Sequence, residues 1–326
     1  MLRAMNPRPP LSPPALRRSP LLAALLLGAV AAPAVRAQET PYSEEHESRP
    51  RFSFLGEAGV NYQFDTDIDG PGEAEFSVLR YDVGLVVSTD LTDKLRWANT
   101  FFAGVSDYDF SGGGFAADDP WETIVLLRYG SQLVYRLNER WGVRGGGVFM
   151  FSRETDADWS TSFMGGGTAG VDSGGGARLF LPAGLGVTSQ IEDDARGVPA
   201  VGFHWRASED WTVRVGAVPV SGGALAGGEV EYSFNEALAL GLGVQWSQRR
   251  FRLDDEGVAP DGVGEDQSLP LRLRLGWKCL PNVSVHLLAG VALAGELELA
   301  DRDGNELRNE DYDPAPYLGL RVLGRF

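Results

Sequence analysis

Several long segments of the chain alternate between apolar side chains and polar or small ones. In the clearest case every second residue is apolar: Leu269, Leu271, Leu273, Leu275 and Trp277. The same period of two runs through 238–247 and 283–293. This is the period of a β-strand with one apolar face. The runs extend over about 10 to 15 residues, whereas soluble strands usually have about 5–6 and a membrane-crossing strand needs about 9–11.

Short turns separate these alternating segments. Each has an apolar or small residue, three turn residues and an apolar residue that restarts the alternation; they lie at 91–95, 137–141, 181–185, 207–211, 234–238 and 280–284. Longer connections rich in Asp, Gly and Pro lie near 65–73, 109–120, 153–163, 193–197, 218–228, 252–267 and 300–314. Tight turns at one end and long loops at the other are typical of transmembrane barrels.

The number of connections sets the expected strand count. Six short turns and seven long loops predict an all-β chain that forms a transmembrane, antiparallel, up-and-down β-barrel of fourteen strands. The region 153–200 is the hardest to divide, and one hairpin fewer there would give twelve strands. Single-chain bacterial barrels have even numbers of strands, so both counts are consistent with closure.

The first residues are typical of an export signal. Arg17 and Arg18 precede a short apolar run at 21–30, and Val35-Arg36-Ala37 is a small-x-small cleavage pattern. We therefore expect a signal peptide at 1–37, a polar segment at 38–50 that could enter the lumen as a plug, and the barrel at 51–326.

Composition excludes several classes of protein. A formal net charge of −16 argues against a nucleic-acid partner. The single Cys excludes a disulfide scaffold and a CxxC metal site. No run of 18 apolar residues is present, so no helical membrane span is expected. The 42 glycines disfavour long helices and suit curved, crowded strands.

The C-terminal strand carries a further signal. Leu318, Leu320 and Val322 alternate with smaller or charged residues, and the chain ends on Phe326. A terminal aromatic residue on an alternating strand resembles the assembly signal of bacterial outer-membrane β-barrel proteins. The resemblance is to that class as a whole. It implies insertion into outer-membrane lipid of a Gram-negative-type bacterium, with the barrel-assembly machinery as a partner that reads the last strand.

The parity of each strand assigns its faces. The lipid face collects apolar residues such as Leu79, Val83, Leu127 and Val215. Aromatic residues should form girdles at both membrane interfaces. We expect one girdle near the short turns at Trp97, Trp141, Trp205, Trp211 and Trp277, and the other near the long loops at Tyr62, Phe64, Trp121, Phe151 and Trp246.

The opposite parity collects the charged residues. Because a charge at the lipid midplane costs about 2–4 kcal/mol, we assign these residues to the lumen: Arg80, Arg96, Arg128, Arg136, Arg144, Arg206, Arg214, Arg272, Arg274, Lys278, Arg321, Arg325, Glu57, Asp82, Glu229, Glu231, Glu296 and Glu298. Two interpretations remain open: an arginine-lined passage that selects anions, or arginine–carboxylate pairs that fill the interior.

Sites for chemistry are few. Asp65, Asp67 and Asp69 resemble the start of a calcium loop, but its twelfth position is Phe76 instead of Glu; the alternative is an acidic surface loop. Ser284 and His286 share one face, yet no orienting carboxylate or oxyanion hole is evident. We therefore expect no cofactor apart from Ca²⁺ in that loop, and no enzyme.

The function that follows is a channel or transporter for a small solute. Two alternatives remain. One is a non-channel barrel with a structural or surface role, whose acidic loops bind divalent cations or a partner. The other is a soluble periplasmic β protein.

Overall fold

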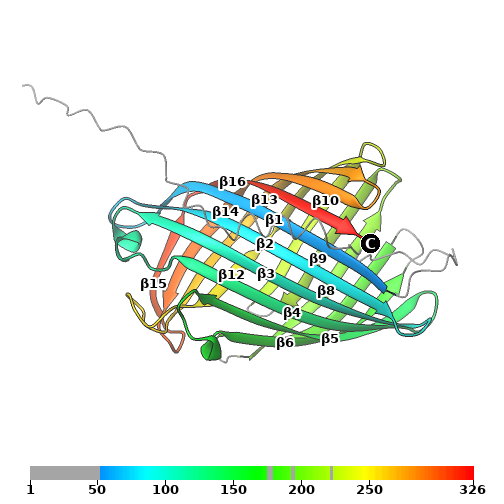
Figure 1. Cartoon of the computed structure of the whole chain (residues 1–326), viewed down its shortest axis with the longest axis horizontal. Coiled ribbons are helices and arrows are strands. Elements are labelled where there is room, and N and C mark those ends of the chain that lie inside the picture. Colours follow the sequence, from blue (N-terminus) through cyan, green and yellow to red (C-terminus); the bar gives the residue numbers. More distant parts are fainter. Residues whose placement is uncertain (1–51, 175–178, 192–194, 221–222) are drawn as a thin grey trace, which may run out of the picture.

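The computed structural model describes residues 52–174, 179–191, 195–220 and 223–326. The predicted signal peptide and the 38–50 segment lie outside the described residues. The described part is a closed, antiparallel, up-and-down barrel (Figure 1). Its elements are β1 (Phe52–Ile68), β2 (Ala74–Asp90), β3 (Leu95–Ser111), η1 (Gly114–Asp118), β4 (Thr123–Arg136), β5 (Trp141–Glu154), η2 (Trp159–Thr161), β6 (Phe163–Gly174), β7 (Leu179–Ser189), β8 (Ala195–Arg206), β9 (Trp211–Val220), β10 (Gly223–Ser233), β11 (Leu238–Gln245), β12 (Ser247–Arg252), β13 (Val263–Leu280), β14 (Val283–Ala300), β15 (Glu306–Tyr312) and β16 (Ala315–Arg325).

Fourteen strands make the wall, which confirms the predicted barrel and its strand count. Two of them are interrupted: β11 passes into β12 at Trp246, and β15 passes into β16 at Asp313 and Pro314. The barrel closes where β1 pairs with β16, from Leu55 opposite Arg325 to Gln63 opposite Tyr317. Among the described residues, no helix is long and apolar enough to span a membrane.

Four of the short turns are each stabilised by one polar residue. In the turn after β2, the Thr92 hydroxyl accepts hydrogen bonds from the backbone N–H groups of Lys94 and Leu95 at 3.2 and 3.0 Å. Asn138, Ser208 and Asn235 do the same in the turns after β4, β8 and β10. Such side-chain bonds replace the backbone partners that the turn loses. The shared pattern in the sequence is therefore a repeated turn structure.

Several connections differ from the prediction. The long loop expected at 300–314 contains β15 (Glu306–Tyr312), and that expected at 252–267 contains the start of β13. The turn expected at 181–185 lies inside β7, where Leu181 and Leu185 are exposed on the outer face and the alternation continues through Pro182. Pairing of β7 with β8 skips from Phe180 to Ala183, because proline has no N–H to donate. The long loop expected at 218–228 is also mainly strand, since β9 runs to Val220 and β10 starts at Gly223.

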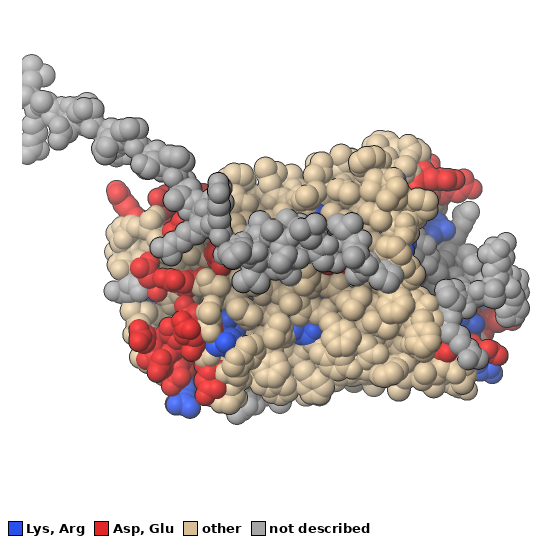
Figure 2. Space-filling view, in the orientation of Figure 1, with Lys and Arg blue, Asp and Glu red and all other residues tan. Residues whose placement is uncertain are grey.

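The outer wall is apolar between its two ends. Figure 2 shows few charged side chains in this band, while carboxylates gather at the end with the long connections. All five tryptophans of the short-turn girdle are 39–55% exposed: Trp97, Trp141, Trp205, Trp211 and Trp277. At the opposite interface Phe64 is exposed, but Trp121 is buried. Its indole packs inside the barrel against Phe251 and Phe115, which corrects its assignment to the second girdle.

The long-loop half of the lumen is filled by one cluster of buried side chains. We call this cluster the mouth core; its members are Ile68, Ala74, Phe76, Val78, Tyr108, Phe115, Ala116, Trp121, Ile124, Phe251, Leu253, Ala259, Ala292, Leu297, Leu299, Tyr312 and Ala315. They come from β1–β4, β12, β14–β16, the η1 segment and the connections that carry Trp121, Leu253 and Ala259. This cluster gives the long-loop end of the lumen a buried, mainly apolar interior.

The strand β12 reaches across the barrel to complete this packing. The backbone N–H of Trp246 donates to the Ala226 carbonyl of β10 at 2.7 Å. Beyond that point β12 leaves β10, and it pairs in parallel with β5 where Arg252 lies opposite Arg153. One face of β12 places Phe251 in the mouth core. On the other face, Arg252 donates to carbonyls of Thr161 and Ile191 at 3.1 Å. The wide fourteen-stranded lumen therefore narrows sharply toward the long loops.

Candidate functional site

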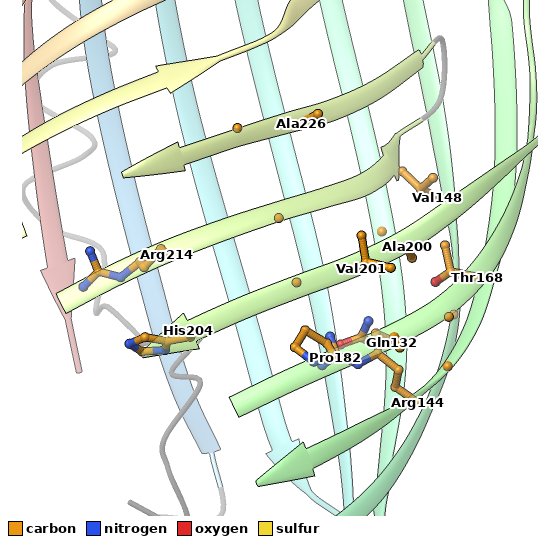
Figure 3. Close-up of a pocket in the computed structure, with 18 of the residues that line it drawn as sticks. Gln132, Arg144, Val148, Thr168, Pro182, Ala200, Val201, His204, Arg214 and Ala226 are labelled. Atoms are coloured by element: carbon orange, nitrogen blue, oxygen red, sulfur yellow. The ribbon is translucent and has the colours of Figure 1, made fainter. Parts of the chain in front are cut away.

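A cavity of about 600 Å³ occupies the lumen on the side of β4–β10 (Figure 3). Its lining is mainly backbone and small side chains from adjacent strands. The polar lining residues are Thr100, Ser131, Gln132, Thr168, His204 and Gln245, and the charged ones are Arg144, Arg214, Arg272 and Glu229. Pro182 and Ala200 in Figure 3 belong to the same wall. This is the composition expected of a small-molecule site, with few polar groups on an otherwise weakly polar surface.

Glycine creates the space. Eleven cavity-lining residues lack a side chain: Gly130, Gly146, Gly147, Gly166, Gly167, Gly170, Gly184, Gly202, Gly216, Gly227 and Gly228. At Gly227 a Cβ atom would lie 2.6 Å from the Val244 carbonyl oxygen, so close strand approach excludes a larger residue there. At Gly216 the nearest atom would be 3.6 Å away, so that position is open to a side chain. Several glycines thus keep the cavity empty without being required by the backbone.

Charged residues meet on the β9–β13 side. Glu229 and Glu231 project from β10 toward arginines of β9 and β13. Arg274 Nη2 lies 2.6 Å from Glu229 Oε1 and 2.5 Å from Glu231 Oε2. Arg214 reaches the same two carboxylates at 3.2 Å each. The sequence placed all of these on lumen parity, and the structure brings them together.

Other predicted lumen residues form separate pairs. Arg144 Nε donates to Asp172 Oδ1 at 2.6 Å on the β5–β6 side. Arg321 Nη2 lies 3.0 Å from Asp82 Oδ1, and Arg321 Nη1 lies 3.5 Å from Glu57. Much of the predicted interior charge is therefore neutralised locally.

The remaining basic residues are more dispersed. Arg96 Nε lies 3.4 Å from Asp90 Oδ1 near the first short turn. The Arg128 guanidinium lies 4.8 Å from the centre of the Phe102 ring. Four more basic residues lie at the short-turn end. Arg136, Arg206 and Arg325 are the last residues of β4, β8 and β16, and Lys278 lies two residues before the end of β13.

Two acidic residues depart from the predicted parity. Ala294 has a φ of 47°, and the pairing register of β13 and β14 shifts between Gln267 and Leu269. Beyond this bulge, each residue of β14 lies on the face opposite to the one that the alternation predicts. Leu297 joins the mouth core, so Glu296 and Glu298 lie on the opposite face from that core. They bind Gln267 and Arg250 there instead of lining the cavity, which corrects their assignment to the lumen.

The aspartates proposed for calcium lie mainly on a strand. Asp67 pairs with Glu75 within the β1–β2 ladder, and the Asp69 N–H donates to the Asp311 carbonyl at 2.8 Å. An extended backbone directs Asp65 and Asp67 outward without curling them around an ion. Within the described ranges, no group of three His, Cys, Asp or Glu residues could hold a metal ion.

Ser284 and His286 lie on β14, near the short-turn end. His286 Nδ1 is 3.4 Å from Arg274 Nη1, within the arginine–glutamate cluster. In the described part of the chain no hydrogen bond joins Ser284 to His286. A nucleophile–base pair requires that bond.

The sequence does not predict the buried carboxylate of Asp266. Asp266 is fully buried, and it accepts hydrogen bonds from Arg80 and Tyr108 at 2.7 Å each and from Tyr312 at 3.3 Å. Arg249 on β12 lies 3.5 Å away. Residues 252–267 read as an acidic loop, because the inward course of β12 has no signature in the alternation. The segment Gln248–Phe251 holds the signal that could have indicated this strand, because Arg249 and Phe251 alternate onto one face of it.

Comparisons with known proteins bear on the fold. No protein-family model and no curated protein matches the chain. Among solved structures, a deltaS2 mutant of the TodX monoaromatic hydrocarbon channel superposes with a TM-score of 0.51 and 10% identity, over 86% of this chain and 91% of that one. The toluene transporter TodX of P. putida gives 0.49 and 9%, over 88% and 93%. The COG4313 outer membrane channel of Pseudomonas putida F1 gives 0.46 and 16%, over 87% and 99%. The resemblance to bacterial outer-membrane barrels is thus confirmed for the fold.

Proposed function

We propose that the protein is an outer-membrane channel through which a small, mainly apolar solute passes by way of the glycine-lined cavity. The observation that carries this proposal is the cavity itself, which opens inside a closed barrel and whose lining is more apolar than polar. A wall of backbone and small side chains offers contact to an apolar molecule while holding it weakly. Weak binding suits a passage, because a solute that enters must also leave.

The size of the cavity supports a small solute. An engineered apolar cavity of about 150 Å³ holds benzene, and this cavity has about 600 Å³. A single aromatic ring with substituents therefore fits with space to move. The similarly folded TodX deltaS2 mutant is described as a monoaromatic hydrocarbon channel, which agrees with this size class.

The outer wall supports the location. An apolar band between a tryptophan girdle and an acidic rim matches a bilayer with two aqueous faces. A soluble periplasmic barrel would not expose residues such as Leu185 and Leu242, which are 73% and 55% exposed. Phe326, whose backbone exchanges hydrogen bonds with Phe54, ends the closing strand and remains our proposed signal for the assembly machinery.

A non-channel barrel is the second candidate. The mouth core and β12 fill the long-loop half of the lumen, and this filling favours a structural role. An enzyme is disfavoured, since His286 faces the Arg274 guanidinium and not Ser284.

Solute uptake separates the two candidates. The purified barrel is reconstituted into lipid vesicles, and the initial uptake of benzyl alcohol is measured against protein-free vesicles. A channel predicts protein-dependent uptake that is proportional to the amount of folded barrel. Uptake equal to the lipid leak, from a barrel that still shows heat-modifiable gel migration, would favour the non-channel role.

A further inference from the structure

The cluster around Glu229 contains more positive than negative charge. Three arginines, Arg214, Arg272 and Arg274, contact two carboxylates, Glu229 and Glu231. Arg274 and Arg214 each bind both carboxylates, so the carboxylate oxygens are largely satisfied by these two residues. The cluster therefore retains one positive charge that these glutamates do not neutralise.

That charge is concentrated at Arg272. Its one ion-pair contact is Nη2 to Glu229 Oε2 at 3.4 Å, longer than any contact of Arg274 to these glutamates. Its buried Nε has no hydrogen-bond partner among the described residues. The side chain is 34% exposed, and Arg272 lines the cavity. A guanidinium in this state retains donors for a further acceptor.

The strand neighbours of Arg272 add no side chain of their own beside its guanidinium. The residues paired with it on the neighbouring strands are Gly243 and Gly290, neither of which has a side chain. Tyr317 packs over Gly290, where an added Cβ would lie 2.6 Å from the phenol oxygen. Arg272 thus stands beside an aromatic ring, at the edge of a weakly polar cavity.

We infer that Arg272 is an anion subsite, which binds the carboxylate of a small organic acid whose apolar part lies against the glycine-lined wall. A guanidinium matches a carboxylate through two parallel hydrogen bonds. One bound carboxylate would bring the formal charge of the cluster to zero. The inference rests on the proposed channel function, because the acid reaches Arg272 from the cavity.

The test compares benzoate with benzamide, which has nearly the same shape and no charge. Uptake of each is measured in vesicles containing the wild-type barrel, Arg272→Gln or Arg302→Gln. Arg302 is an exposed residue of a long connection, 63% exposed, so its substitution removes the same charge away from the cavity. Heat-modifiable migration confirms that each barrel is folded.

Arg272→Gln should lower the benzoate-to-benzamide uptake ratio by about tenfold, as expected for loss of a charged hydrogen bond, with benzamide uptake retained. Arg302→Gln should keep the wild-type ratio. An unchanged ratio in folded Arg272→Gln, or an equal fall in Arg302→Gln, would overturn the anion subsite while leaving the channel intact. A wild-type barrel that admits neither compound would instead overturn the proposed function.

Discussion

Arg80 and Asp266 join two strands of the barrel that are not neighbours in the wall. Arg80 Nη2 on β2 lies 2.7 Å from Asp266 Oδ2 on β13, and the Asp266 side chain is fully buried. Arg249 brings β12 to the same carboxylate. One aspartate therefore holds the inward-folded strand against the wall and fixes the closed form of the mouth.

Replacing that carboxylate should destabilise the barrel. Asp266→Asn leaves the buried Arg80 guanidinium and the partly exposed Arg249 guanidinium without their counter-charge, and breaking a buried pair in this way costs about 3–5 kcal/mol. We expect a loss of this size in the free energy of unfolding, measured by urea titration in lipid vesicles. Asp261→Asn is the matched control, because the Arg302–Asp261 pair is exposed and worth less than about 1 kcal/mol. Equal losses in both variants would contradict the role assigned to Asp266.

The position of the membrane can be tested with two leucines of equal exposure. Leu242 on β11 is 55% exposed and Leu307 on β15 is 54% exposed, but Leu242 lies in the apolar band and Leu307 beyond it, near the long connections. Leu242→Arg should therefore lower the free energy of unfolding in vesicles by about 2–4 kcal/mol. Leu307→Arg should change it by less than about 1 kcal/mol. Similar effects at the two positions would show that the bilayer is placed wrongly.

The connection after β14 should respond to acid. Hydrogen bonds from the Asn305 side chain and backbone hold the pKa of Asp301 below its usual value. Because the folded pKa is the lower one, the stabilisation is present at neutral pH and is lost as pH falls through that pKa. The Asn305 amide should then be protected from hydrogen exchange down to about pH 4 and lose protection below it. An Asp301→Asn variant should lack this pH step; a step that persists in it would assign the effect to another group.

The sequence predicts the regular features of the fold because each leaves a periodic signal. Alternation gives the strands and their faces, and the residues Thr92, Asn138, Ser208 and Asn235 mark four of the short turns. The arginine–glutamate cluster follows from parity, since Glu229, Glu231, Arg272 and Arg274 share the lumen face.

What the sequence does not predict arises where the chain departs from the period. The bulge at Ala294 exchanges the faces of one strand without any unusual residue. The inward course of β12 depends on contacts with β5 and Asp266 that are distant in sequence. Pro182 suggests a turn, although β7 accommodates it by interrupting its pairing with β8 at that position. The cavity depends on which glycines face the lumen, and the number of glycines in the sequence does not show which ones do.

The central claim is that solute passes through the glycine-lined cavity, and filling the cavity tests it most directly. Gly216 faces the cavity, and a Cβ atom added there would lie 3.6 Å from its nearest neighbour. At Gly145, on the outer face of β5, the corresponding distance would be 3.8 Å. Both positions therefore accept Phe without backbone clash. The measurement is the initial uptake of benzyl alcohol into vesicles that contain equal amounts of folded wild-type, Gly216→Phe or Gly145→Phe barrel. Passage through the cavity predicts that Gly216→Phe loses most of the protein-dependent uptake while Gly145→Phe keeps the wild-type rate. Undiminished uptake by folded Gly216→Phe would contradict it.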